Sequence, residues 1–333
     1  QGLSPAPGSR LSWESAPAFE RMERAGFQRD ARKLNEPQHE GAAARFFYQL
    51  LTEEPMQLHL LYHPITSTPL QQSARHWEVS PSEPLQPYLR CFWGPVKEGI
   101  AEKVGELVIP DTCMDLIFEK DSLTGKRTVH FCTLNDEAFI SNPSGTIVKE
   151  RFGIRMYPWT VALLTKRPLN GTKNGCCEGE DFFPALTKAV LAMLEETTSF
   201  SARCILAESI IYEALWQKSG SPDCLNVLDG FIRREGRWSV KEAAQSICVS
   251  SRQLERLFAS HFGVTPKTMM KLLRYQCLWQ SAVYDPTFRP ADAALRFGYT
   301  DQAHMANEFR LYHTMPLKQA LEMARDPVVF LQE

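Results

Sequence analysis

Two stretches with the same pattern, about fifty residues apart, constrain what the C-terminal third of this chain can fold into. The first, residues 239–262, reads SVKEAAQSICVSSRQLERLFASHF. Ser239 with Glu242, and Ser250 with Gln253, have the spacing of capping boxes, which predicts a helix start at each serine. The apolar residues between and after them are spaced to pack two helices together: Ala243, Ala244, Ile247, Leu254, Leu257 and Phe258. We therefore expect two short helices joined by a tight turn, the geometry of a helix-turn-helix.

The second stretch, residues 290–313, reads PADAALRFGYTDQAHMANEFRLYH. Gly298 and Tyr299 are expected to form its turn, and Thr300 to cap its second helix. Met305 and Phe309 are spaced to face inward together. The packing face of its first helix consists of Ala293, Ala294 and Phe297. The pattern of the first stretch is thus repeated.

The residues between the two stretches predict one long helix over 266–284, with Pro266 at its first position. At ~1.5 Å per residue such a helix spans roughly 28 Å. This length is close to the ~34–36 Å that separates successive major-groove faces of DNA. One chain could therefore place two recognition helices on one side of a duplex without dimerising.

Composition sets broad limits on the class of protein. The chain has 333 residues, with 44% hydrophobic and 23% charged residues, which is typical of a globular protein of two domains. We see no secretory signal and no apolar run long enough for a membrane span, so we expect no membrane partner. The nine cysteines are scattered and odd in number, which fits a reducing cytoplasm. Residues 225–333 carry 14 basic and 11 acidic residues, a net charge of +3, whereas the remainder is acidic.

We divide the rest of the chain by changes in pattern. Residues 1–75 are expected to be an arm of unknown role, with a helix over 40–54 and a strand over 56–62. His59 and His63 are four residues apart, but satisfied or exposed histidines explain them better than a metal site. Residues 76–220 would form a β-rich sensory or dimerisation domain, and residues 225–325 the DNA-binding domain. The predicted strands are 88–93, 106–109, 114–118, 128–133, 138–140 and 150–155.

Short strands separated by turns suggest a barrel or sandwich that could hold a small effector. The aromatic side chains that could line its interior are Phe92, Trp93, Phe118, Phe131, Tyr157 and Trp159, although for any one of them a place in the core is the better interpretation. Residues 182–218 predict a pair of helices that forms either a homodimer face or a packing cap for the barrel. The predicted fold class is thus α+β, a β-rich barrel or sandwich with a helical pair, followed by an all-α domain.

The C-terminal region, 225–323, resembles the AraC/XylS family of bacterial transcription regulators. The resemblance rests on both helix-turn-helix units, on residues 262–266 (FGVTP) and on residues 297–299 (FGY). A weaker resemblance to a sensory domain of some members lies in residues 110–118 and 152–155. The chain departs from the family at Cys248, where Gly is usual, at Asn307, where a basic residue is usual, and at residues 312–316. The second unit departs more, so it is expected to hold phosphates more than to read bases.

The resemblance implies a regulator that binds promoter DNA and responds to a small-molecule effector, with RNA polymerase as a further partner. On the first recognition helix the groove-side residues would be Arg252, Glu255 and Arg256, and on the second Gln302, Ala303 and Asn307. Arg suits guanine, Glu suits cytosine, Gln and Asn suit adenine, and Ala suits a thymine methyl group. His304 would be structural. The phosphate candidates are Ser251, Lys267, Lys271 and Arg274.

An enzyme is the competing class, with residues 76–160 as a catalytic barrel tethered to DNA. The chain lacks the motifs G-x-S-x-G, Walker A, G-x-G-x-x-G and H-E-x-x-H, so we expect neither catalysis nor a cofactor. Asp111, Cys113 and Asp115 are closely spaced, but a turn followed by a strand explains them as well.

Overall fold

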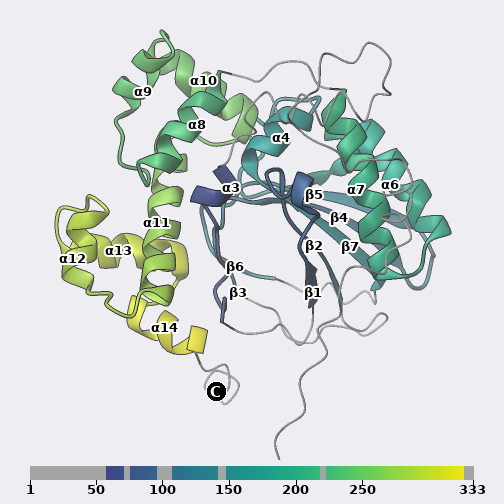
Figure 1. Cartoon of the computed structure of the whole chain (residues 1–333), viewed down its shortest axis with the longest axis horizontal. Coiled ribbons are helices and arrows are strands. Elements are labelled where there is room, and N and C mark those ends of the chain that lie inside the picture. Colours follow the sequence, from purple (N-terminus) through teal and green to yellow (C-terminus); the bar gives the residue numbers. More distant parts are fainter. Residues whose placement is uncertain (1–57, 71–75, 96–106, 142–147, 218–222, 326–333) are drawn as a thin grey trace, which may run out of the picture. The chain divides into compact units, whose positions relative to one another are not determined.

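A computed structural model describes residues 58–70, 76–95, 107–141, 148–217 and 223–325, all of which belong to one compact unit. The helix expected over 40–54 lies outside these ranges. Over the ranges that are described, no helix has the length and apolar character needed to cross a membrane. Figure 1 shows a sheet followed along the chain by helices.

The N-terminal part is built on an antiparallel sheet of six strands in the order β1-β2-β7-β4-β5-β8. A second small sheet pairs β3 with β6. All six predicted strands are confirmed. The strands are β1 (His76–Val79), β2 (Leu89–Pro95), β3 (Leu107–Val108), β4 (Met114–Asp121), β5 (Arg127–Cys132), β6 (Phe139–Ile140), β7 (Val148–Met156) and β8 (Cys176–Glu178). The large sheet is open, with β1 and β8 as its edges, so the described strands form no closed barrel.

Helices α5 (Gly179–Phe182), α6 (Pro184–Glu196) and α7 (Phe200–Trp216) cover one face of the large sheet (Figure 1). Phe131 packs against Phe182 and Phe183 with ring centroids 5.2 and 4.9 Å apart, and Phe152 packs against Phe200 at 5.9 Å. The opposite face is half-buried and carries the alternate residues of each strand, many of them charged. The pair of helices predicted over 182–218 is therefore present, and it caps a sheet.

The strand expected over Met56–Tyr62 is wrong for its described part. Residues Leu58–Leu61 form the short helix α3 instead. Leu58 and Tyr62 are i and i+4, and both are buried, because helical spacing puts them on one face against helix α8 (Cys224–Arg233). The Tyr62 hydroxyl is 2.9 Å from the Thr112 hydroxyl.

The C-terminal part is entirely helical and confirms both helix-turn-helix units. After α8 come α9 (Val240–Ser246), α10 (Ser251–Phe262), α11 (Pro266–Tyr284), α12 (Pro290–Arg296), α13 (Gln302–His313) and α14 (Leu317–Arg325). Helix α11 is the predicted long helix, with Pro266 in its first turn. The two units lie at the two ends of α11 (Figure 1).

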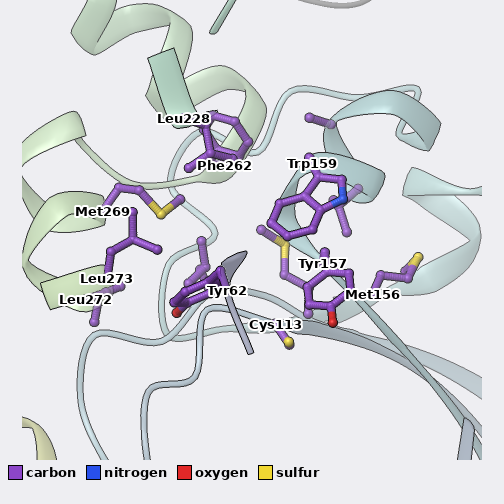
Figure 2. Close-up of a cluster of buried hydrophobic side chains, with 14 of the residues drawn as sticks. Tyr62, Cys113, Met156, Tyr157, Trp159, Leu228, Phe262, Met269, Leu272 and Leu273 are labelled. Atoms are coloured by element: carbon purple, nitrogen blue, oxygen red, sulfur yellow. The ribbon is translucent and has the colours of Figure 1, made fainter. Parts of the chain in front are cut away.

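Helix α11 also packs against segments of the N-terminal half. Figure 2 shows one buried cluster in which side chains of α8, α10 and α11 meet those of the N-terminal half. The labelled members are Tyr62, Cys113, Met156, Tyr157, Trp159, Leu228, Phe262, Met269, Leu272 and Leu273. The fully buried Gln276 accepts a hydrogen bond from the Ile65 amide at 2.9 Å and donates to the carbonyl oxygens of Ile65 (3.2 Å) and Pro110 (2.6 Å). Residues 58–67 therefore serve as packing elements.

Candidate nucleic-acid interface

The first helix-turn-helix unit begins as the sequence predicts. Both capping boxes are present, with Ser239 accepting from the Glu242 amide at 3.1 Å and Ser250 accepting from the Gln253 amide at 3.2 Å. The turn between the helices places Cys248 in the left-handed region at φ 56°. That conformation favours glycine and explains why the related family has Gly there.

The second unit has the same form with one difference in its cap. Asp301, not Thr300, is the N-cap of α13, and its carboxylate accepts the His304 amide at 2.7 Å. The predicted cap is therefore wrong by one residue. Gly298 has φ 72° in the turn, and Thr314 has φ 62° where the first unit has Gly263 at φ 73°. The Tyr299 and His304 rings meet edge to face at 5.5 Å, which gives His304 a packing role.

Helix α10 buries one side and exposes the other. Leu254 and Phe258 are fully buried in the domain core. The remaining side carries the exposed residues Ser251, Arg252, Glu255 and Arg256. Across the described ranges, neither Arg252 nor Arg256 has an ion-pair or hydrogen-bond partner within the chain. These guanidinium groups are therefore free to bind an external acceptor.

Helix α13 repeats this division. Met305 and Phe309 are buried, as predicted. Gln302, Ala303 and Asn307 are exposed. Arg310 is also exposed, seven residues after Ala303 and three after Asn307, so it continues the same face of the helix.

A basic side chain thus lies on this face about one turn after Asn307. Sequence reasoning missed Arg310 because it compared the two units position by position. The i, i+3 and i, i+7 spacing along α13 would have found it.

Three further candidates lie on α11, and they differ in their surroundings. Lys267 is exposed near the start of the helix. Arg274 instead binds the buried Glu308 through two nitrogens at 2.5 and 3.2 Å and lies over the Tyr299 ring at 4.4 Å. Lys271 is 3.4 Å from the other oxygen of Glu308. Arg274 and Lys271 are therefore engaged in holding α13 against α11, a role that the sequence did not indicate.

Five of the six aromatics considered for effector binding lie in the buried core, as the core interpretation predicts, and Trp93 does not. Phe92, Phe118 and Phe131 lie fully buried on the helix-covered face of the sheet. Tyr157 and Trp159 stack on each other at 4.4 Å just beyond β7. Of the six, Trp93 alone lies on the opposite face. Adjacent aromatic residues of one strand alternate between faces, which separates Trp93 from Phe92.

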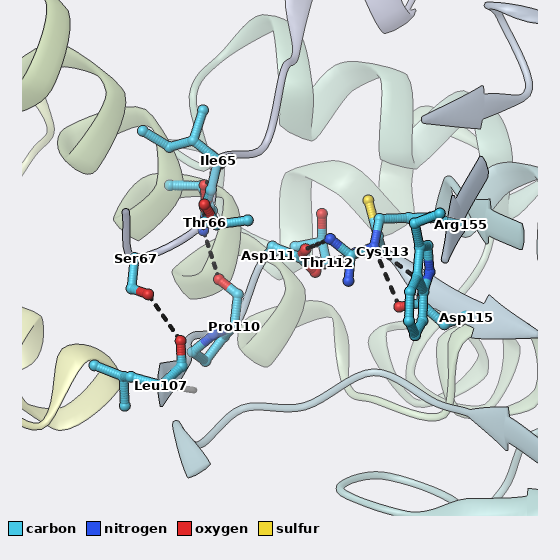
Figure 3. Close-up of polar contacts among 12 residues, drawn as sticks. Ile65, Thr66, Ser67, Leu107, Pro110, Asp111, Thr112, Cys113, Asp115 and Arg155 are labelled. Atoms are coloured by element: carbon cyan, nitrogen blue, oxygen red, sulfur yellow. Dashed lines mark hydrogen bonds and ion pairs between the residues drawn. The ribbon is translucent and has the colours of Figure 1, made fainter. Parts of the chain in front are cut away.

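Trp93 is part of a charged cluster on that opposite face, and Figure 3 shows the cluster members Asp111, Asp115 and Arg155. Its indole nitrogen donates to Asp115 at 2.7 Å, and Arg155 donates to the same carboxylate at 3.1 Å. Arg155 is also 3.5 Å from Asp111. Burial raises the pKa of Asp111, although the Arg155 guanidinium opposes this shift. The two carboxylates noted in the sequence thus share one guanidinium.

Comparison with known families places two domains on the chain. Residues 243–323 match the model of a helix-turn-helix domain. Residues 77–178 match the model of a domain of unknown function (DUF6597). No curated protein shows significant similarity to the chain.

Several solved structures are similar to parts of this chain. A transcriptional regulator from Chromobacterium violaceum, described as having an AraC-type DNA-binding domain, is 20% identical, with 31% of this chain and 96% of that chain covered and a TM-score of 0.28. ToxT from Vibrio cholerae is 10% identical, with 67% and 96% covered and a TM-score of 0.36. ToxT bound to (E)-4-(8-methylnaphthalen-1-yl)but-3-enoic acid is 9% identical, with 75% and 98% covered and a TM-score of 0.34.

The assignment rests on the match to the family model and on the two units seen in the fold. Both agree with the resemblance that the sequence motifs indicate. Residues 243–323 form a helix-turn-helix domain of the AraC type.

Proposed function

We propose that this chain is a sequence-specific transcription regulator that binds double-stranded promoter DNA through α10 and α13. One observation carries the proposal. Each of the two recognition helices buries its apolar side in the domain core and presents polar side chains to solvent, and the two arginines on α10 have no partner within the described chain. A buried or ion-paired arginine would have to be released before it could bind DNA, whereas Arg252 and Arg256 need no release.

In this proposal the first unit reads bases and the second positions the chain. Arg252 donates to guanine, with Arg256 beside it, and Glu255 accepts from cytosine. On α13, Gln302 and Asn307 contact adenine and Ala303 contacts a thymine methyl group, while Arg310 adds a phosphate contact. Ser251 and Lys267 bind phosphates. Lys271 and Arg274 act indirectly by fixing the position of α13 through Glu308.

Fluorescence anisotropy with a duplex selected from a random library tests the proposal. Arg252→Ala should weaken binding to the selected duplex by roughly 5- to 150-fold, the equivalent of ~1–3 kcal/mol for one bidentate contact. Its binding to a scrambled duplex should change much less. Arg167→Ala is the matched control, because Arg167 is exposed, pairs with Asp181 at 2.7 Å and lies outside the helix-turn-helix domain. Equal affinity and equal preference in Arg252→Ala and Arg167→Ala would contradict the assignment.

We further propose that a small-molecule effector binds the N-terminal domain on the face that carries Trp93. The support is the chemistry of this face, which combines an indole with the charged pair Asp115 and Arg155. The Trp93 ring lies directly over Gly153, where a Cβ would come within 2.2 Å of it. Native mass spectrometry of protein from its own host would detect a retained ligand. Trp93→Ala should lose that ligand, whereas Phe118→Leu, on the other face, should keep it.

Helix α7 supports a homodimer as the working assembly. Ile205 and Leu206 are 53% and 44% exposed on it, although its opposite side packs in the core. Light scattering on the wild type and on Ile205→Glu measures the assembly. A dimer that survives this change would place the interface elsewhere.

A further inference from the structure

Two free cysteines face each other at the edge of the large sheet. Cys132 is the last residue of β5 and Cys176 is the first of β8, the edge strand, and the two are directly paired in the register. Their sulfur atoms are 3.5 Å apart. Cys176 is exposed, so a small reagent can reach it from solvent.

The backbone already has the geometry of a disulfide. Directly opposed residues in an antiparallel pair have Cα atoms about 4.5–5.5 Å apart. Disulfides span Cα distances of about 4.4–6.8 Å. The sulfur atoms need to approach by only about 1.5 Å to reach the ~2.05 Å bond length, which side-chain rotation can supply. Cys177 cannot compete, because alternation along β8 places it on the other face, opposite Phe131.

The surroundings of Cys176 favour its thiolate. Hydrogen bonds from Cys132 and then from His130 lower the pKa of Cys176 to about 5. The same contact, and then burial, raise the pKa of Cys132, so Cys132 is the thiol of the pair that keeps its proton. The other charged groups that face this site in the described chain include Asp115, directly opposite Cys132 on β4, Glu119, 3.9 Å from His130, and Glu178, which pairs with His130 across the strands. One sulfur is therefore the nucleophile and the other is placed to resolve it.

We propose that Cys132 and Cys176 form an oxidation site at which a hydroperoxide converts the two thiols into a disulfide between β5 and β8. The Cys176 thiolate attacks the terminal peroxide oxygen, the O–O bond breaks, and the leaving alkoxide or hydroxide takes a proton. The Cys132 sulfur then attacks the sulfur of the resulting sulfenic acid and releases water. The dithiol loses two electrons, and the peroxide is reduced to an alcohol or water, so the overall step is balanced.

The site does not depend on the proposed regulation of DNA. Neither cysteine belongs to α10 or α13, and chemistry at the thiols can be measured without a duplex. The site is nevertheless near the first helix-turn-helix unit. The Thr133 amide, next to Cys132, donates to the Gly175 carbonyl at 3.0 Å, and earlier in the same loop the Leu169 amide donates to the Ser260 carbonyl of α10 at 2.8 Å.

Peptide mass spectrometry of the oxidised full chain tests the proposal directly. Trypsin releases Cys132 in residues 128–149 and both Cys176 and Cys177 in residues 174–188. After treatment with hydrogen peroxide, we expect these two peptides joined, both in the wild type and in Cys177→Ala. Cys132→Ala should instead accumulate a sulfenic acid on Cys176 that dimedone traps. The proposal is overturned if both thiols remain open to alkylation, or if Cys176 joins only Cys177 or a second chain.

The pH dependence of alkylation by iodoacetamide provides an independent measurement. At pH 5.5 a thiol with the pKa of Cys176 is mostly thiolate, but its intrinsic nucleophilicity is lower than that of an ordinary thiol. The two effects together leave it roughly 20-fold faster than an equally accessible thiol with a pKa of ~8.5. In the wild type we expect the alkylation rate of Cys176 to be nearly independent of pH above pH 6. In His130→Ala we expect this rate to rise with pH. A tenfold loss of rate per pH unit below pH 8 in the wild type would overturn the assignment.

Discussion

The buried imidazole of His313 makes a quantitative prediction about acid stability. His313 is fully buried where α13 packs on α11, and its Nδ1 atom is 2.8 Å from the Tyr275 hydroxyl. The ring lies 4.8 Å from the Phe309 ring and 4.7 Å from that of Trp279. Its other nitrogen has no hydrogen-bond partner in the described chain. Burial lowers the pKa of His313 from 6.5 to about 3, so the folded protein holds this ring neutral.

The shift determines both the sign and the size of the effect. Because the folded-state pKa is depressed, His313 stabilises the fold fully above pH 6.5, and this stability is lost as the pH falls from 6.5 towards 3. At pH 5 the unfolded chain binds a proton on this histidine that the folded chain cannot bind. The interval that counts is the ~1.5 pH units between the unfolded-state pKa of 6.5 and pH 5. At ~1.36 kcal/mol per unit, the free energy of unfolding falls by about 2 kcal/mol between pH 7.5 and pH 5.

Urea denaturation followed by circular dichroism at pH 7.5 and pH 5 measures this loss. The variant for comparison is His313→Phe with Tyr275→Phe, which removes both partners of the hydrogen bond and leaves no orphaned polar group. Phenylalanine suits the position, because Phe262 occupies the corresponding buried site of the first unit. The double variant should lose about 2 kcal/mol less than the wild type over this interval. An equal loss in both proteins would refute the reasoning, since all other titrating groups are shared.

Three other changes have defined outcomes. Thr314→Gly should raise the free energy of unfolding by about 0.5–1 kcal/mol, because it relieves a β-branched residue at φ 62°, whereas Gly263→Ala at the matching position should lower it. Glu150→Gln should cost about 3 kcal/mol in the same urea assay, because the buried guanidinium of Arg203, 2.8 Å away, loses its carboxylate. Gln276→Ala should accelerate hydrogen exchange in residues 58–67, as it removes three buried hydrogen bonds to the N-terminal half; unchanged exchange would argue that packing alone holds this contact.

The helical C-terminal region could be predicted well because its signals are local. Ser239 and Ser250 each find the capping partner three residues later, and apolar residues at helical spacing identify the buried sides. The strands could be predicted for the same reason. The error at Thr300 is also local, since Asp301 beside it is an equally good cap and the backbone selects one of them.

The contacts that the sequence did not reveal join residues far apart in the chain. From the sequence alone Arg274 is predicted to bind phosphate, because its partner Glu308 is 34 residues away. No residue close to Arg274 in the sequence indicates that pairing. Cys132 and Cys176, 44 residues apart, become partners only through the pairing of β5 with β8. Among the aromatics, Phe92 and Trp93 are consecutive in one strand, so their side chains point to opposite faces of the sheet. Composition does not indicate which of the two faces the helices. Pairing and the choice of face are properties of the whole sheet.

Helix α11 connects these contacts into one mechanical unit. Arg274 and Tyr275 hold α13 through Glu308 and His313, while Gln276 and Trp279 hold residues 65–66 and 110 of the N-terminal half. Because these residues lie within two turns of a single helix, a displacement of the N-terminal segments cannot move Gln276 without also moving Tyr275. The first unit is tied to the N-terminal half separately, through the hydrogen bond from Leu169 to Ser260 of α10. Both recognition helices are therefore connected to the N-terminal half, α10 through Leu169 and the shared buried cluster, and α13 through α11.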